Sequence, residues 1–190
     1  MTTIYLAGKM GKVQGACDCD HGDACHPHCY IEHVHGCGSE FWEDNWRHEI
    51  LREKPHHGAR IRFANGYTFG GPWFIQHDNH GLGSDARHIA QSCMDWIGQS
   101  DAVFAWLTHL DAYGTFAEIG YAKALRKPVF LAVDRSKLDA DDELGFWFLK
   151  DLADGVCSVR NSRTGFAIFT HWLAARTAQA RSSAPKWSRW

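Results

Sequence analysis

Apolar and polar residues alternate along this chain with two periods, one typical of strands and one typical of helices. Five short runs rich in apolar or β-branched residues are predicted to be strands: 3–7, 60–63, 102–107, 127–133 and 156–159. The third and fourth of these runs are almost continuously apolar, which is typical of strands buried on both faces of a parallel sheet. Five amphipathic stretches are predicted to be helices: 40–52, 84–98, 115–125, 144–152 and 166–181.

The order of these elements favours an α/β three-layer sandwich with a doubly wound parallel sheet of the flavodoxin or Rossmann type. The length suits a single domain over residues 1–190. Residues 65–72 are rich in turn-forming residues and are expected to be a loop. In sheets of this kind the ligand binds beyond the carboxyl ends of the strands. We therefore expect functional residues in the loops that follow Ala7, Phe63, Leu107 and Val133.

Composition and charge limit the classes of protein to be considered. Hydrophobic residues make up 45% of the chain and charged residues 22%, which is usual for a globular protein. No apolar run reaches the roughly 20 residues that span a bilayer, and the first residues lack the features of a signal peptide. We therefore expect a cytoplasmic protein without membrane contact. The formal net charge of −2 argues against nucleic acid as a partner.

Cysteine and histidine are concentrated in one short window of the chain. Five of the 7 Cys and five of the 13 His lie between Cys17 and Cys37. In a cytosolic chain this favours a metal over disulfides, because a bound metal supplies the folding energy that a segment with few large apolar residues lacks. We expect residues 14–38 to be an inserted metal-binding segment that holds structural Zn²⁺, with no organic cofactor. The alternative is a flexible His/Cys loop without metal.

The ligands within this window are less well defined than the window itself. The first choices are Cys17, Cys19, Cys25 and Cys29. His33, His35 and Cys37 are substitutes, or part of a second site. The two cysteines outside the window, Cys93 and Cys157, stand in apolar contexts and are predicted to be small buried side chains.

The segment after the apolar run 102–107 carries the strongest chemical signal. Gly114 and Thr115 are placed to start a helix at the carboxyl end of that strand, and Glu118 is expected in the first turn of the helix. A carboxylate in this position lies at the mouth of the site, near backbone N–H groups that favour its ionised form. The alternative is a glutamate that only complements the helix dipole.

The residues around Glu118 also resemble a known family. The pattern D-x-Y-G-T-x-x-E-I-G-Y-A, from Asp111 to Ala122 and followed by K-P-V, resembles the signature of the nucleoside 2-deoxyribosyltransferase family. Residues 3–8 resemble the opening strand of that family, so that the resemblance covers the framework up to about residue 133. Members of the family break the bond between a nucleobase and deoxyribose and pass the sugar to another base or to water.

The resemblance implies roles for three residues. Glu118 would be the nucleophile, Tyr5 would orient or tune it, and Asp111 would bind or protonate the base. In the family the acidic residue stands closer to the glycine, so Asp111 fits only after a one-residue shift. Asp78 is a second candidate for the acid.

Further residues are expected to contact the substrate. They are Gly8, Trp73, Asp78, His80, Tyr113 and Gly114. His77 and His80 could act as acids or belong to a hydrogen-bonded polar loop. Of Trp73 and Phe74, one is expected to stack on the base and the other to lie in the core. Arg47 could bind a phosphate, but a solvent-exposed helix arginine is the favoured interpretation.

We expect an enzyme that cleaves or transfers the N-glycosidic bond of a 2′-deoxynucleoside or its 5′-monophosphate through a covalent intermediate on Glu118. The alternatives are an NAD-cleaving N-glycoside hydrolase, or a zinc-dependent binding module on an inactive scaffold. A homo-oligomer is also expected, because Trp172, Trp187 and Trp190 would be exposed in a monomer. The family resemblance points to an oligomer as well.

Overall fold

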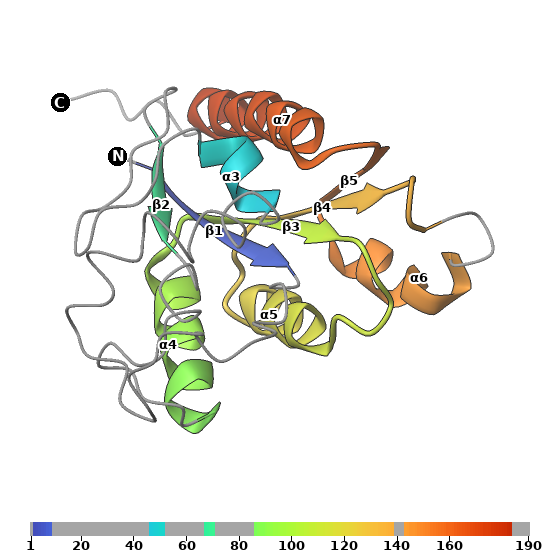
Figure 1. Ribbon diagram of the computed structural model, residues 1–190. Coiled ribbons are helices and arrows are strands. Elements are labelled where there is room, and N and C mark those ends of the chain that lie inside the picture. Colours follow the sequence, from blue (N-terminus) through green and yellow to red (C-terminus); the bar gives the residue numbers. More distant parts are fainter. Residues whose placement is uncertain (1, 9–45, 52–66, 71–85, 139–142, 184–190) are drawn as a thin grey trace, which may run out of the picture.

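A computed structural model of the chain describes residues 2–8, 46–51, 67–70, 86–138 and 143–183. Five parallel strands form one sheet in the order β2-β1-β3-β4-β5 (Figure 1). The strands are β1 (Thr3–Gly8), β2 (Thr68–Gly70), β3 (Ala102–Leu107), β4 (Val129–Asp134) and β5 (Gly155–Val159). This strand order is the flavodoxin-like one, and it confirms the predicted doubly wound sheet.

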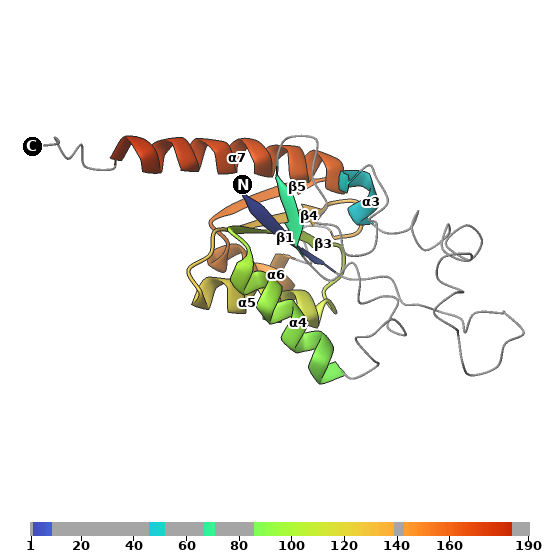
Figure 2. The ribbon, with the colours of Figure 1, turned by 90° about the vertical axis from the view of Figure 1, so that its left-hand side faces the viewer.

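Helices cover both faces of the sheet. They are α3 (Trp46–Leu51), α4 (Ala86–Gln99), α5 (Tyr113–Ala124), α6 (Glu143–Leu152) and α7 (Ser162–Ser183). α3 and α7 lie on one face, and α4, α5 and α6 on the other (Figure 1 and Figure 2). Side chains of β1 alternate between the two layers: Ile4 and Leu6 join the core under α7, whereas Tyr5 and Ala7 join the core under α5. The predicted three-layer sandwich is thus confirmed.

The strand order changes direction at β1. β1 has β2 on one side and β3 on the other. α3 follows β1 on one face of the sheet, and α5 follows β3 on the opposite face. In doubly wound sheets, ligands bind at such a switch point, beyond the carboxyl ends of the two strands. A ligand site is therefore expected at the carboxyl ends of β1 and β3.

An aromatic layer joins α7 to the sheet. The ring of Phe130 in β4 lies 5.3 Å from that of Trp172 and 5.7 Å from that of Phe169. Trp172 is therefore partly buried against the core, and the prediction that a monomer leaves it exposed was wrong. Trp187 and Trp190 lie outside the described residues. The homo-oligomer stays a prediction.

β2 corrects one sequence prediction. Residues 65–72 are predicted to be a loop, yet they contain a short strand. The N–H of Thr68 donates a 2.9 Å hydrogen bond to the carbonyl of Thr2, and Thr68 stands opposite Thr3 in the β1 ladder. Pairing with β1, rather than an apolar run, therefore defines this edge strand. The strand predicted at 60–63 lies outside the described residues.

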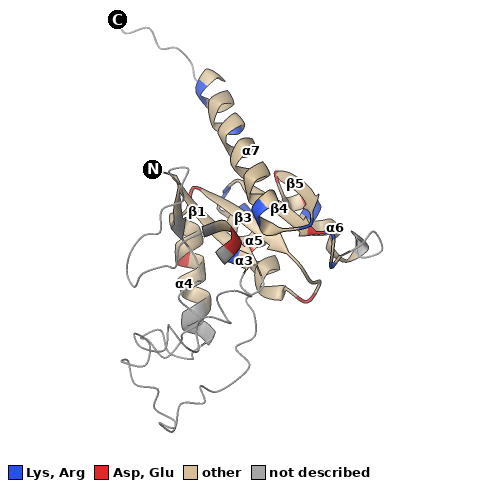
Figure 3. Cartoon of the chain, turned by 45° about the horizontal axis from the view of Figure 1, so that its top comes forward, with Lys and Arg blue, Asp and Glu red and all other residues tan. Residues whose placement is uncertain are grey.

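α7 begins at Ser162, earlier than the start predicted at residue 166. The side-chain oxygen of Asn161 accepts a 2.8 Å hydrogen bond from the N–H of Thr164 and caps the first turn. The helix contains three arginines and no acidic residue, and Figure 3 colours arginine and lysine positions blue along the ribbon. No helix in the described part of the chain is both long enough and apolar enough to cross a bilayer.

Gly155→Ala tests how tightly β5 packs beneath α7. A Cβ at residue 155 would stand 2.6 Å from Cδ2 of Phe130 and 3.0 Å from Nε1 of Trp172. Because the packed rings must shift to admit it, the free energy of unfolding should fall by about 1–3 kcal/mol. Urea unfolding measures this change. Wild-type stability in Gly155→Ala would contradict the packing.

Gly120→Ala in α5 is the matched control for this substitution. A Cβ at residue 120 would meet nothing within 4 Å. The higher helix propensity of alanine should then raise the free energy of unfolding by up to about 1 kcal/mol.

Candidate active site

Tyr5 of β1 and Glu118 of α5 form the central pair of the candidate site. The O–H of Tyr5 donates a 2.6 Å hydrogen bond to Oε1 of Glu118. Tyr5 is fully buried, and Glu118 is partly buried. The two residues that the family resemblance pairs therefore touch, although they are far apart in the sequence.

The position of Glu118 within α5 corrects a second prediction. α5 begins at Tyr113, earlier than the start predicted at residue 115, so Glu118 lies in the second turn. First-turn N–H groups therefore do not stabilise its carboxylate, contrary to the sequence prediction. The donor comes instead from Tyr5 on the neighbouring strand.

The local environment holds the carboxyl of Glu118 near its titration midpoint at neutral pH. Burial raises the pKa of Glu118 to about 7, because the ionised form loses water. The O–H of Tyr5, the positive charge of Arg47 and the thiol of Cys93 oppose this effect and lower the pKa. Desolvation is the largest of these effects, so the pKa stays above its usual range.

Tyr5 can act only as a hydrogen-bond donor to this carboxylate. Burial, together with the nearby charge of Glu118, raises the pKa of Tyr5 far above its usual value. The phenol therefore keeps its proton at physiological pH. Its hydrogen bond occupies Oε1 of Glu118 and fixes the orientation of the carboxyl group.

Arg47 of α3 is buried, which overturns the prediction of a solvent-exposed helix arginine. Its Nη2 donates hydrogen bonds of 3.1 Å to the carbonyls of both Leu6 and Gly8, and its guanidinium stacks 4.5 Å from the ring centre of Trp46. Burial lowers the pKa of Arg47 to about 10, so the group stays charged at neutral pH. The spacing of Arg47 and Ile50, three residues apart on one helix face, is the signal that could have indicated this burial.

Cys93 of α4 is a third neighbour of the pair, which its apolar sequence context did not indicate. It is partly buried, and its thiol interacts with Tyr5 and Glu118. Burial raises the pKa of the Cys93 thiol, so it stays protonated. The prediction of a small buried side chain thus missed its place in the site. Cys157 on β5 is also partly buried, packed against the core under α7.

Gly8, which is expected to contact the substrate, is tightly packed by the protein itself. A Cβ at residue 8 would stand 2.6 Å from Cζ2 of Trp46 and 3.0 Å from the carbonyl oxygen of Trp106. The glycine therefore allows α3 to approach the end of β1. The predicted contact of Gly8 with the substrate stays a prediction.

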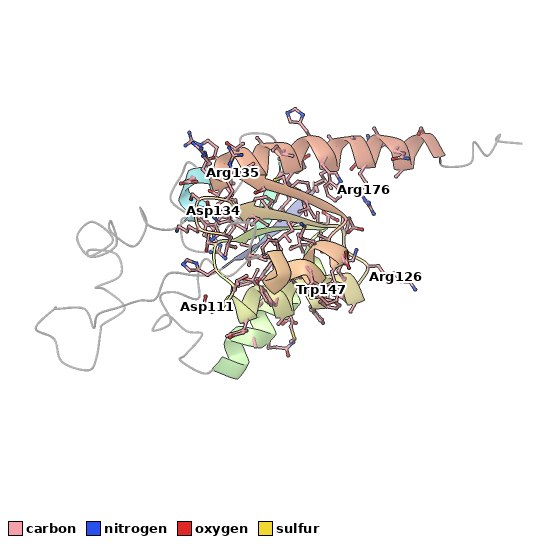
Figure 4. The ribbon with its side chains drawn as sticks, turned by 90° about the vertical axis from the view of Figure 1, so that its right-hand side faces the viewer. Asp111, Arg126, Asp134, Arg135, Trp147 and Arg176 are labelled. Atoms are coloured by element: carbon pink, nitrogen blue, oxygen red, sulfur yellow. The ribbon has the colours of Figure 1, made fainter. Side chains whose placement is uncertain are left out.

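Asp111, Tyr113 and Gly114 lie where β3 leads into α5, and Figure 4 labels Asp111. All three are exposed, Tyr113 to 75%. A Cβ on Gly114 would meet nothing within 4 Å, so the space beside the start of α5 is open. These residues therefore stand on the solvent side of the carboxyl end of β3, and their roles stay predictions.

Several predicted site residues lie outside the described residues. They are Cys17, Cys19, Cys25, Cys29, Trp73, Asp78 and His80, with the segment 14–38 as a whole. Within the described ranges, no three His, Cys, Asp or Glu side chains form a group that could hold a metal ion. The zinc site therefore also stays a prediction.

The fold and the central pair define an α/β protein with a hydrogen-bonded carboxyl and phenol at the switch point of a flavodoxin-like sheet. The sequence profile described as nucleoside 2-deoxyribosyltransferase matches residues 38–158, which is more than half of the chain. The chain therefore belongs to the nucleoside 2-deoxyribosyltransferase family. The match includes Glu118 but begins after β1, so Tyr5 joins the site from outside it. Searches of curated proteins and of solved structures found no match.

The raised pKa of Glu118 predicts how stability depends on pH. The folded protein holds this proton up to about pH 7, whereas the usual value is 4.5. The contribution of this proton to the free energy of unfolding is therefore fully present below about pH 4.5. It is lost as the pH rises through 7, which lowers the free energy of unfolding by up to about 3 kcal/mol.

Glu118→Gln removes this titration and is the variant to compare with the wild type. The variant should gain about 2–3 kcal/mol of stability relative to the wild type between pH 5 and pH 8. Urea unfolding at a series of pH values measures the difference. A constant difference across this range would contradict the raised pKa.

Proposed function

We propose that the protein cleaves the N-glycosidic bond of a 2′-deoxynucleoside or its 5′-monophosphate. The sugar is held on Glu118 as a covalent intermediate and then passes to another base or to water. The observation that carries this proposal is the 2.6 Å hydrogen bond between Tyr5 and Glu118 in a chain of the nucleoside 2-deoxyribosyltransferase family. A partly buried carboxylate beside a fixed donor suits a reaction that develops positive charge on the sugar.

In the first step a Glu118 oxygen attacks the anomeric carbon of the sugar, and the bond from that carbon to the base nitrogen breaks. Tyr5 holds Oε1, so in this mechanism Oε2 is the oxygen that attacks the sugar. The leaving base takes the electron pair of the broken bond and a proton from an acid. Asp111, exposed at the carboxyl end of β3, and Asp78 are the candidates for that acid.

In the second step the nitrogen of an acceptor base or a water molecule attacks the same carbon, and the ester to Glu118 breaks. Two inversions give net retention at the anomeric carbon. The proton lost by the acceptor returns to the acid that protonated the leaving base. Because Tyr5 keeps its own proton, it orients the carboxylate in both steps and does not serve as a base.

Glu118→Gln and Glu118→Ala should lower base release by about 1000-fold or more, because both remove the nucleophile. Base release is measured by chromatography with a panel of deoxynucleosides, their 5′-monophosphates and NAD. Asp95→Asn is the control, since Asp95 is an exposed carboxylate on α4 bonded to Gln91 and should not affect turnover. A deoxynucleoside with fluorine at the sugar 2′ position should add the mass of the fluorinated sugar to a peptide that contains Glu118.

Each alternative function predicts a different result in the same assay. Base released from NAD alone would favour the NAD-cleaving hydrolase. Absence of base release from every compound would favour the binding module on an inactive scaffold. Wild-type turnover in Glu118→Ala would refute the covalent mechanism.

We also propose that the Cys/His window binds structural zinc. Protein purified without added metal should carry about one Zn²⁺ per chain by elemental analysis, because four Cys or His ligands complete one tetrahedral site. Cys25→Ser combined with Cys29→Ser should lower this content, whereas Cys157→Ser on β5 should leave it unchanged. Metal-free native protein in which all five window cysteines react with a thiol reagent would contradict the proposal.

A further inference from the structure

Arg47 is the largest fully buried side chain of the described residues, and it lies at the carboxyl end of β1. One of its nitrogens holds two carbonyls of that strand, Leu6 and Gly8, at 3.1 Å each. The ring of Trp46 covers the guanidinium, with 4.5 Å between the guanidinium carbon and the ring centre. The guanidinium of Arg47, which α3 carries, is thus fixed by the carboxyl end of β1 and by the ring of Trp46.

A fully buried positive charge is costly unless its surroundings compensate for the lost water. The two carbonyls accept hydrogen bonds but carry no net negative charge. Among the described residues, the carboxylate of Glu118 is a negative group that acts on Arg47, and it raises the pKa of Arg47 against the effect of burial. The guanidinium and the carboxylate therefore stabilise each other across the end of β1.

Three described groups, each from a different element, act on the charge of Glu118. They are the phenol of Tyr5 from β1, the thiol of Cys93 from α4 and the guanidinium of Arg47 from α3. The phenol and the thiol are neutral at pH 7 because burial keeps both protonated. Arg47 is the one of the three that supplies a full positive charge.

We propose that Arg47 is a positioning residue for this site. Its guanidinium holds the carbonyls of Leu6 and Gly8 at the end of the strand that carries Tyr5, and it adds a fixed positive charge to the group of side chains around Glu118. The catalytic consequence rests on the proposed function, since only an ionised Glu118 can attack a sugar. The geometry and the charge coupling do not depend on which substrate is bound.

The sign of the effect follows from Coulomb's law. A nearby positive charge favours the ionised carboxylate, so removing it makes the carboxyl hold its proton to higher pH. In Arg47→Gln, Glu118 should titrate about one pH unit higher than in the wild type. At pH 7 the ionised fraction should then fall several-fold, with a matching fall in kcat/KM for base release.

The direct experiment follows the side-chain carboxyl carbon of Glu118 by NMR in protein labelled with ¹³C-glutamate, and Glu118→Gln identifies the signal. Arg47→Lys keeps the charge and should titrate near the wild-type midpoint. Arg163→Gln is the matched control, because this exposed arginine donates a 3.2 Å hydrogen bond from its Nε to the carbonyl of Glu49 on α3. It should leave the midpoint unchanged. A wild-type midpoint in folded Arg47→Gln would overturn the proposal.

A second measurement uses the wild-type protein, in case Arg47→Gln does not fold. The ¹⁵Nε resonance of Arg47 should shift with a midpoint near pH 7 as Glu118 ionises, and Glu118→Gln should abolish this shift. An Arg47 resonance that stays constant while Glu118 titrates would refute the coupling. Neither titration needs a substrate, so failure of this proposal is distinguishable from absence of base release, which refutes the proposed function instead.

Discussion

The hydrogen bond between Tyr5 and Glu118 is the contact on which the rest of the site depends. It joins a residue of the first strand to one 113 positions later in the chain. Two features of the fold make it possible: β1 pairs directly with β3, and the alternation of side chains along β1 turns Tyr5 toward the layer that contains α5. A slip of one residue in the register of β1 would turn the phenol toward α7 and leave the carboxyl without its donor.

The hydrogen bond from Tyr5 offsets part of the free energy that is lost when the carboxylate of Glu118 is buried. Desolvation alone favours the neutral form of Glu118, whereas the phenol and the guanidinium favour the ionised form. The balance leaves both forms accessible near neutral pH. The partly buried carboxyl of Glu118 therefore lowers the stability of the fold. Such a cost is expected at positions that serve chemistry rather than stability.

The sequence predicts the interior of this fold better than its edges. The bounds of β3 follow directly from its continuous apolar run, because every residue of that strand is buried. β2 was missed, because three residues at a sheet edge are strand-forming only through their partner β1. A short motif identified Glu118, but the helix register and the desolvation that sets its charge depend on tertiary packing.

The positions of the other two residues of the site also depend on tertiary packing rather than on a sequence motif. Arg47 and Cys93 stand in unremarkable helical sequences, and only the packing of α3 and α4 around β1 brings them to the pair. An arginine is normally assigned to the surface because its charge is costly to bury. Its partners include two backbone carbonyls, which leave no sequence pattern, so the spacing of Arg47 and Ile50 indicates burial but not what the guanidinium contacts.

α7 extends well beyond the sheet that it covers (Figure 2). Its 22 residues span about 33 Å, whereas a six-residue strand spans about 20 Å. Leu173 is its last buried residue, and the positions from 174 to 182 are exposed. The helix starts beside α3, where the hydroxyl of Ser162 donates a hydrogen bond to the carbonyl of Trp46, and it runs back past the opposite edge of the sheet (Figure 2). A fluorophore or an immobilising linker attached at Arg181 would therefore lie beyond the sheet, at the end of α7 away from the carboxyl ends of the strands.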